Sequence, residues 1–294
     1  MRDPKLHEHP LLLNPDYAEK CFPGKVHSDS VVMTNKQSLH IISCSSFLGF
    51  GDALDTQLYF GSAAKSICCN EAEHGVSTMN VLWRMFAWSL SACVNGRHPI
   101  LDWQHKAWLP GSREAKAANK PLTPQGWVFA IVGICADLDE LCNEYRLAHF
   151  NSNKPCFWCP CNTTDMPWSD FSEEALFLRH LYGPDGEGHG EQLIPGHPIW
   201  EIPGVTRFSV LWDILHGLDL GPTLHVTANV ILDLAEDERL GENRTSGLGV
   251  VWAGVQKYYK TLGVANTLSN LTLSMITEPN SVNTVFPRLH AKGE

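Results

Sequence analysis

The chain has 294 residues, enough for one large domain or two modest ones, and its hydrophobic content of 44% is ordinary for a globular protein. No uninterrupted apolar run is long enough to predict a membrane span. The formal net charge of −10 argues against a chain that coats nucleic acid unaided, because phosphate contacts need clustered lysine and arginine. A nucleic-acid role would therefore need a local site, bridging metal ions or a basic domain outside this chain.

The N-terminal residues lack the apolar stretch of a secretory signal, so we expect an intracellular protein with reduced cysteines. Ten cysteines in 294 residues are too few for a disulfide scaffold, and they are interpreted as buried thiols or metal ligands. Seven of them stand singly or beside apolar residues and are expected to be small buried hydrophobes: Cys21, Cys44, Cys68, Cys69, Cys93, Cys135 and Cys142.

The first half of the chain predicts three strands, a helix, a buried strand and a second helix, from the spacing of its apolar residues. Ser77 or Thr78 can cap the first helix and Gly96 can end it, while Asp137 ends the buried strand. The predicted segments are, in order, 25–33, 38–50, 54–64, 77–96, 127–137 and 138–147.

This order of elements is the opening order of the RNase H-like fold, in which the first and fourth strands lie side by side. Asp29 on the first strand and Asp137 at the end of the fourth would then face each other. We predict an α/β protein with an RNase H-like mixed sheet, a zinc-binding insertion and a mostly helical C-terminal half.

Four segments follow from the composition along the chain. Helical patterning returns after a Cys- and Gly-rich stretch, and the pair Gly221-Pro222 is expected to break it. The segments are an irregular lead-in (1–24), the first part of the RNase H-like core (25–148), the zinc-binding insertion (149–206) and a helical segment leading to a truncated end of the core (207–294).

The most informative short motif is Cys156-Phe-Trp-Cys159, a Cys-x2-Cys knuckle that can put two thiolates on one tetrahedral cation. A thioredoxin-type redox pair lies at the N-terminus of a helix after a strand, whereas Pro155 and the following Pro-Cys-Asn favour a loop. Zinc is the favoured interpretation, and a redox pair or inert loop thiols are the alternatives.

The thiol pair supplies half of a zinc site, so two further ligands are needed. We predict His216 as the third ligand and His225 as the fourth, with His149 and Cys161 as rivals for the fourth place. Asp213 precedes His216 by one helical turn and would orient its imidazole, although an isolated Asp-x2-His is more often a hydrogen bond on a helix surface.

An aspartate after a strand, then Cys-x2-Cys, then Asp-x2-His, resembles the catalytic domain of eukaryotic cut-and-paste DNA transposases, most closely the CACTA-type branch. The residues that carry the resemblance are ADLDELCNEYRLAHFNSNKPCFWCPC and WDILHGLDLGPTLH. The segment DMPWSDF is similar to transposon-derived proteins of dinoflagellate-like algae. The resemblance is specific over about residues 127–230 and weak over 25–126.

The resemblance implies two-metal phosphoryl transfer, in which carboxylates hold Mg²⁺ ions that activate the attacking oxygen and stabilise the leaving one. Asp137 matches the second catalytic aspartate of the family, and Asp29 matches the first, with Asp52 and Asp55 as rivals. The third acid of the family is a glutamate on a late helix, and Glu294 stands near the expected place.

The expected function is DNA strand cleavage and transfer, in an active or degenerate form, with Zn²⁺ as structural ion and Mg²⁺ as catalytic ion. The alternative is a non-catalytic, zinc-stabilised module that binds nucleic acid or protein. We expect a nuclear protein that binds DNA together with additional domains or subunits and does not bind membranes; homo-oligomerisation is left open. The negative charge and the terminal Glu294 predict weak DNA binding and poor cutting by this chain alone.

Overall fold

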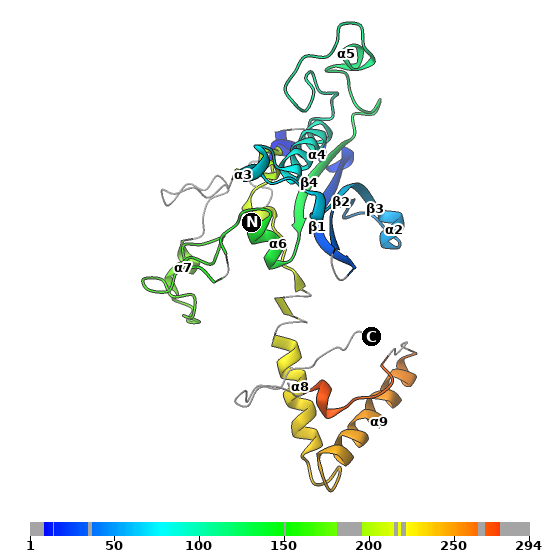
Figure 1. The fold of residues 1–294 in the computed structure, drawn as a ribbon, viewed down its shortest axis with the longest axis vertical. Helices are drawn as coiled ribbons and strands as arrows, with labels where there is room; N and C mark the ends of the chain where they lie inside the picture. The colour runs from blue at the N-terminus through cyan, green and yellow to red at the C-terminus, as the bar shows by residue number, and fades with distance from the viewer. Residues whose placement is uncertain are drawn as a thin grey trace. The chain divides into compact units, whose positions relative to one another are not determined.

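Alternating apolar and polar residues build a mixed β-sheet in the N-terminal part of the chain (Figure 1). The structure, a computed structural model, describes residues 9–13, 15–34, 37–149, 151–180, 196–214, 217–218, 222–263 and 268–276. The chain divides into two compact units, Met1–Trp212 and Asp213–Glu294, and each is considered by itself.

The sheet contains four strands in the order β3-β2-β1-β4. β1 pairs antiparallel with β2, β2 pairs antiparallel with β3, and β4 runs parallel to β1. A parallel pair needs a crossover connection, which the chain between β3 and β4 supplies with helix α4. The strands are β1 (Cys21–Thr34), β2 (Gln37–Ser46), β3 (Gln57–Ala64) and β4 (Val128–Cys135). The expectation of an α/β protein with a mixed sheet is confirmed.

Helix α4 (Thr78–Asn95) covers one face of this sheet, and both of its ends are fixed by the residues that the sequence indicated. Ser77 accepts a hydrogen bond from the backbone N–H of Asn80, and Gly96 ends the helix with a φ of 63°, a conformation that favours glycine. Phe86 packs against Phe60 of β3 with ring centroids 4.6 Å apart. The main core therefore lies between α4 and the sheet.

The lead-in differs from the expectation, because β1 begins at Cys21 and a short helix precedes it. The added strand residues are explained by the parallel partner, since Cys21 pairs with Val128 at the start of β4. The other helices of this unit are η2 (Pro10–Leu13), α1 (Tyr17–Lys20), α2 (Ala53–Thr56), η3 (Lys65–Ile67), α3 (Glu71–His74), α5 (Arg113–Ala117), α6 (Leu138–Asn143), α7 (Leu176–Arg179), η4 (Pro198–Glu201) and η5 (Arg207–Ser209).

The second unit contains α8 (Pro222–Ala235), α9 (Arg244–Leu262) and the short η7 (Leu273–Met275). Its small core includes Ala228, Leu248 and Ile276. A side chain at Gly247 would clash with the backbone carbonyl of Ala235, so glycine permits the close approach of α9 to α8. Gly221, half of the predicted helix break, lies outside the described residues, and the described part of α8 begins at Pro222.

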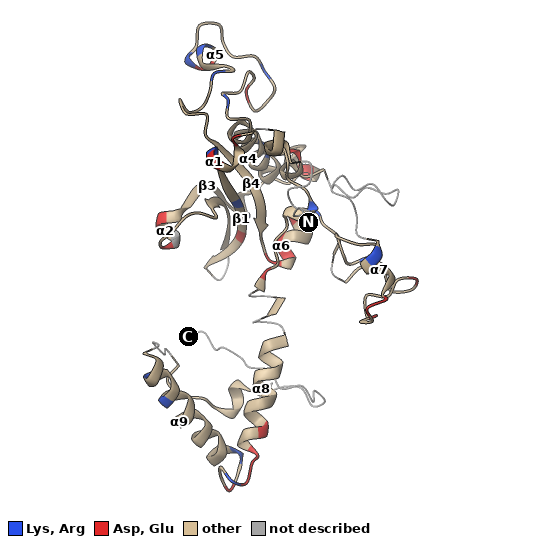
Figure 2. Cartoon of the chain, turned by 180° about the vertical axis from the view of Figure 1, so that it is seen from behind, with Lys and Arg blue, Asp and Glu red and all other residues tan. Residues whose placement is uncertain are grey.

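Among the described residues, no helix is long and apolar enough to cross a membrane. Lys and Arg lie on several elements, among them α5, α7 and α9, and Asp and Glu are likewise spread over several elements (Figure 2).

Candidate functional site

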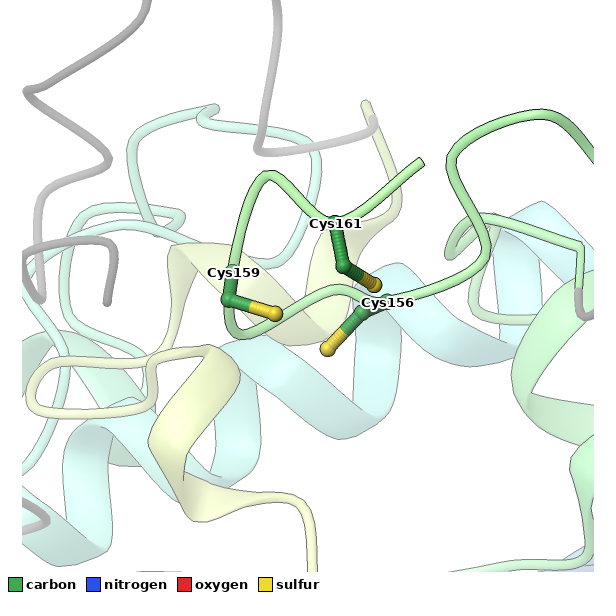
Figure 3. A group of neighbouring side chains, drawn as sticks. All are labelled: Cys156, Cys159 and Cys161. Carbon is green, nitrogen blue, oxygen red and sulfur yellow. The ribbon is translucent and has the colours of Figure 1, made fainter. Parts of the chain in front are cut away.

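Three cysteine side chains converge in the loop that follows α6 and precedes α7 (Figure 3). The Sγ atoms of Cys156, Cys159 and Cys161 all lie within 4.8 Å of one another. Cys159 and Cys161 are buried and Cys156 is half-buried. In a tetrahedral zinc site with Zn–S bonds of about 2.3 Å, the sulfur atoms are about 3.8 Å apart, so a small contraction would suit the ion.

The surroundings of the cluster explain both its stability as thiols and its capacity to bind a metal. Burial raises the pKa of each of the three thiols. The backbone N–H of Trp158 donates a hydrogen bond of 3.3 Å to Cys156 Sγ, which favours a thiolate once a cation is bound. Metal binding must therefore displace thiol protons, and the cluster fits Zn²⁺, which is a common partner of cysteine thiolates in proteins.

The cysteine loop is fastened to the segment that runs beside β4. The indole N–H of Trp158 donates to the carbonyl of Arg207, and the Arg207 guanidinium donates to the carbonyl of Phe157. Three residues later, Val210 forms a parallel bridge with Ile134 of β4. The cysteine loop is thus connected through Arg207 and Val210 to β4, an edge strand of the sheet.

The structure brings one rival ligand, Cys161, to the predicted thiol pair. His149 is half-buried in the same unit, His225 is exposed on α8 in the second unit, and His216 lies outside the described residues. Asp213 is half-buried at the start of the second unit. Ligation by His216 and His225 therefore stays a prediction, whereas the contribution of Cys161 is a feature that the sequence weighed only as an alternative.

The predicted catalytic aspartates lie beyond the paired stretch of two neighbouring parallel strands, Asp29 inside β1 and Asp137 after β4, as the N-cap of α6. The last paired residues of β1 and β4 are His27 and Cys135, so Asp29 and Asp137 each follow by two positions. Side chains two positions apart on a strand share a face, and neighbouring strands are about 5 Å apart. Asp29 therefore lies on the face of the sheet opposite to the buried Ser28, whereas Asp137 lies after β4, where this alternation does not apply.

Each aspartate already fulfils a local role with one oxygen. Asp137 caps α6, its Oδ1 accepting from the backbone N–H of Glu140 at 2.7 Å, and Asp29 Oδ1 accepts from the N–H of Ser30 at 2.6 Å. The second carboxylate oxygen of each forms no hydrogen bond within the described part of the chain. Those two oxygens remain for a hard cation.

The rival aspartates for the first position lie at the other end of the strands. Asp52 and Asp55 follow the end of β2, and Ser46 at that end pairs with Gly24 near the start of β1. Asp29 is paired with Ile41 in the other half of β2. The topology therefore favours Asp29 over both rivals as the neighbour of Asp137.

Among the described residues, one group of three or more His, Cys, Asp or Glu side chains is close enough to hold a single ion, and it is the cysteine cluster. No described acidic residue therefore completes a three-ligand site with Asp29 and Asp137. Glu294, the predicted third acid, lies outside the described residues. Joint binding of metal by Asp29, Asp137 and Glu294 therefore stays a prediction.

Residues next to these aspartates form a buried polar network, which the sequence did not indicate. Ser28 Oγ donates to Glu140 Oε1 at 2.7 Å and lies 2.8 Å from the hydroxyl of Tyr145. His40 Nε2 lies 3.3 Å from the same Glu140 oxygen but lacks hydrogen-bond geometry. Since Ser28 precedes Asp29 and Glu140 donates to Asp137, the network connects the backbone segments that carry both aspartates.

Electrostatics in this network follow from its burial. Burial raises the pKa of Glu140 to about 7, against the opposing effect of the hydrogen bond from Ser28. Burial also lowers the pKa of His40 and raises the pKa of Tyr145 well above its usual value. His40 and Tyr145 are therefore neutral near neutral pH, whereas Glu140 titrates in that range.

The first unit is an α/β unit with a mixed four-stranded sheet and a cluster of three cysteines in the loop between α6 and α7. Comparisons of the chain with protein-family models, with curated proteins and with solved structures gave no match. The functional argument therefore depends on the residues themselves.

Proposed function

We propose that the first unit is an RNase H-like domain derived from a DNA transposase, acting on DNA in the nucleus by metal-dependent strand cleavage and transfer. The observation that supports this proposal is the parallel register of β1 and β4, whose last pair, His27 with Cys135, lies two positions before Asp29 and Asp137. The sheet order β3-β2-β1-β4, the crossover through α4 and the parallel bridge of Val210 beyond β4 support the fold assignment.

The chemistry proposed for the carboxylate pair is the binding of Mg²⁺, because hard oxygen ligands suit this ion. When bound, a pair of such ions activates an attacking oxygen and stabilises the leaving oxygen of a phosphodiester. Asp29 and Asp137 contribute the oxygens that hold the ions, and the cap on α6 fixes the direction of the Asp137 carboxylate. A third carboxylate, which we assign to Glu294, completes the set.

The three cysteines are proposed to hold a structural Zn²⁺ rather than to perform chemistry. Their thiolates suit zinc, and their loop is bonded through Trp158 and Arg207 to the chain beside β4. Zinc at this place would stabilise the edge of the sheet nearest to Asp137.

A second function is a zinc-stabilised binding module without catalysis. The observation that favours it is the missing third acidic ligand in the described part of the chain. The two functions share the zinc site and differ only in whether the aspartates support cleavage.

The test is nicking of supercoiled plasmid by the full chain with Mg²⁺, compared with Asp29→Ala and Asp137→Ala. Asp139→Ala is the matched control, because this aspartate is exposed on the same helix and bonds only Asn143. Slow nicking that both site substitutions abolish and the control keeps supports the proposal. Nicking that is absent, or unchanged by both site substitutions, favours the binding module.

A further inference from the structure

The segment between α4 and β4 is rich in Lys and Arg, in a chain that is acidic as a whole. Residues 97–120 contain five Lys or Arg and only two acidic residues, in a chain of 22 basic and 32 acidic residues. The five basic side chains, all exposed, are Arg97, Lys106, Arg113, Lys116 and Lys120. We call residues 97–120 the basic extension.

The basic side chains of the extension are not neutralised by neighbours. Arg97 donates to the backbone carbonyl of Asn119, and Lys106 donates to the side-chain oxygen of Gln104. None of the five forms an ion pair with a described carboxylate. Several exposed basic residues elsewhere do, since Lys20 pairs with Asp16, Arg179 with Glu174, Arg239 with Asp237, and Arg244 with Glu236.

The extension is held in a defined conformation by α4. The indole N–H of Trp88 on α4 donates to the carbonyl of Leu101, and the Trp88 ring lies edge-on to Trp108 at 6.3 Å. Asp102, one of the two acids, is engaged in the turn, where its Oδ1 accepts from the backbone N–H groups of Gln104 and Lys106. The basic groups are therefore presented by an ordered scaffold.

A hollow of about 570 Å³ opens between α4 and the extension. Arg97, His98, His105 and Asn119 line it together with Trp88 and Asp102. Basic and amide donors beside an aromatic ring are the side-chain types that contact the phosphates and bases of a nucleic acid.

We propose that the basic extension is the site that anchors duplex DNA through its phosphate backbone. This inference rests on the proposed function, since it takes DNA as the substrate of the first unit. It also explains how a chain with a net charge of −10 could bind DNA. The phosphate contacts would be concentrated in the basic extension, while the rest of the chain is acidic. Lys and Arg neutralise phosphates and release counterions, which supplies sequence-independent affinity.

The position of the extension predicts where it contacts the substrate. The extension joins the start of β4, while Asp137 follows the end of the same strand (Figure 1). The eight residues of β4 span about 26 Å at roughly 3.3 Å per residue. A duplex that reaches from the extension to Asp137 therefore spans at least about eight base pairs, at about 3.4 Å per base pair.

The test is binding of a fluorescent duplex DNA of about 25 base pairs to the full chain without divalent metal, as a function of salt. We expect Lys106→Gln, Lys116→Gln and Lys120→Gln together to weaken binding about tenfold or more and to reduce the salt slope by about 2 to 3. The same three positions changed to Arg keep the charge and should keep the affinity, which separates charge from folding.

The matched control is Lys154→Gln, Lys257→Gln and Lys260→Gln, which removes equal charge from exposed positions elsewhere. Three results would overturn the inference. The triple Lys→Gln variant of the extension could bind DNA within twofold of the unchanged chain, the control variant could lose as much affinity, or the unchanged chain could bind an RNA duplex more tightly than DNA. Asp139→Ala should bind DNA normally, because this exposed side chain lies outside the extension. Extension-dependent binding without any cleavage supports the anchor while it contradicts the proposed function.

Discussion

Ser28 on β1 and Glu140 on α6 are joined by a 2.7 Å hydrogen bond between residues 112 positions apart in the sequence. Ser28 precedes Asp29, and Glu140 donates its backbone N–H to Asp137, so the bond braces the two segments that carry the proposed metal ligands. The relationship makes the geometry of the carboxylate pair dependent on a buried polar contact.

Removal of the Ser28 hydroxyl is expected to destabilise the first unit. Ser28→Ala leaves Glu140 and Tyr145 without their shared partner in a buried site, at a cost of about 1–3 kcal/mol in the free energy of unfolding. Urea denaturation measures this change. Ser62→Ala is the control, because the hydrogen bond between Ser62 and Tyr59 is exposed. An equal loss of stability in both variants would contradict a special role for the buried bond between Ser28 and Glu140.

Glu140 should make stability depend on pH in one direction. Because its pKa is raised from 4.5 to about 7, the folded state holds the proton more tightly than the unfolded state. Ionisation of Glu140 therefore lowers the free energy of unfolding. This loss is absent below pH 4.5 and grows as pH rises toward 7, up to about 3 kcal/mol. Glu140→Gln keeps a neutral group at this position and should gain stability relative to the unchanged chain over that range.

Urea denaturation of both proteins between pH 5 and 8 measures the difference, with the range chosen to span about the pKa of Glu140. His40 contributes in the opposite sense, because burial lowers its pKa and stability is lost as pH falls. Comparison of the two proteins at each pH removes that contribution to first order. A difference that stays constant with pH would show that Glu140 does not titrate in this range.

Zinc binding should release about three protons at neutral pH if all three thiols ligate the ion, since burial raises the pKa of each thiol. Calorimetry in buffers of different ionisation enthalpy counts these protons. A site made of Cys156, Cys159 and two histidines would release about two. The proton count therefore distinguishes the three-cysteine cluster from the clasp predicted with His216 and His225.

Substitution of Cys161 should remove zinc as fully as substitution of Cys156. Metal content of the purified variants Cys156→Ser and Cys161→Ser, measured by mass spectrometry, tests this expectation. Cys142→Ser is the control, because its thiol bonds the Ala148 carbonyl outside the cluster. Zinc retained by Cys161→Ser would exclude it as a ligand, and zinc fully retained by His216→Ala would exclude the long-range clasp.

The α/β class and the ends of α4 could be predicted from local patterns, because the strand periodicity, the Ser77 cap and the Gly96 end are encoded by neighbouring residues. The buried pair of Ser28 and Glu140 was not accessible, since only the parallel register of β1 with β4 brings these segments together. Cys161 was underweighted for a related reason. Its proximity to Cys156 depends on how the loop turns at Pro160, which the spacing alone does not specify.

The central claim is that Asp29 and Asp137 form one divalent-metal site. Its most direct test is Mn²⁺ binding to the full chain by electron paramagnetic resonance, with Mn²⁺ as a spectroscopic substitute for Mg²⁺. We predict that Asp29→Asn and Asp137→Asn each weaken binding about tenfold or more, while Asp52→Asn and Asp55→Asn leave it unchanged. Equal Mn²⁺ affinity in the unchanged chain and in both site variants would contradict the claim.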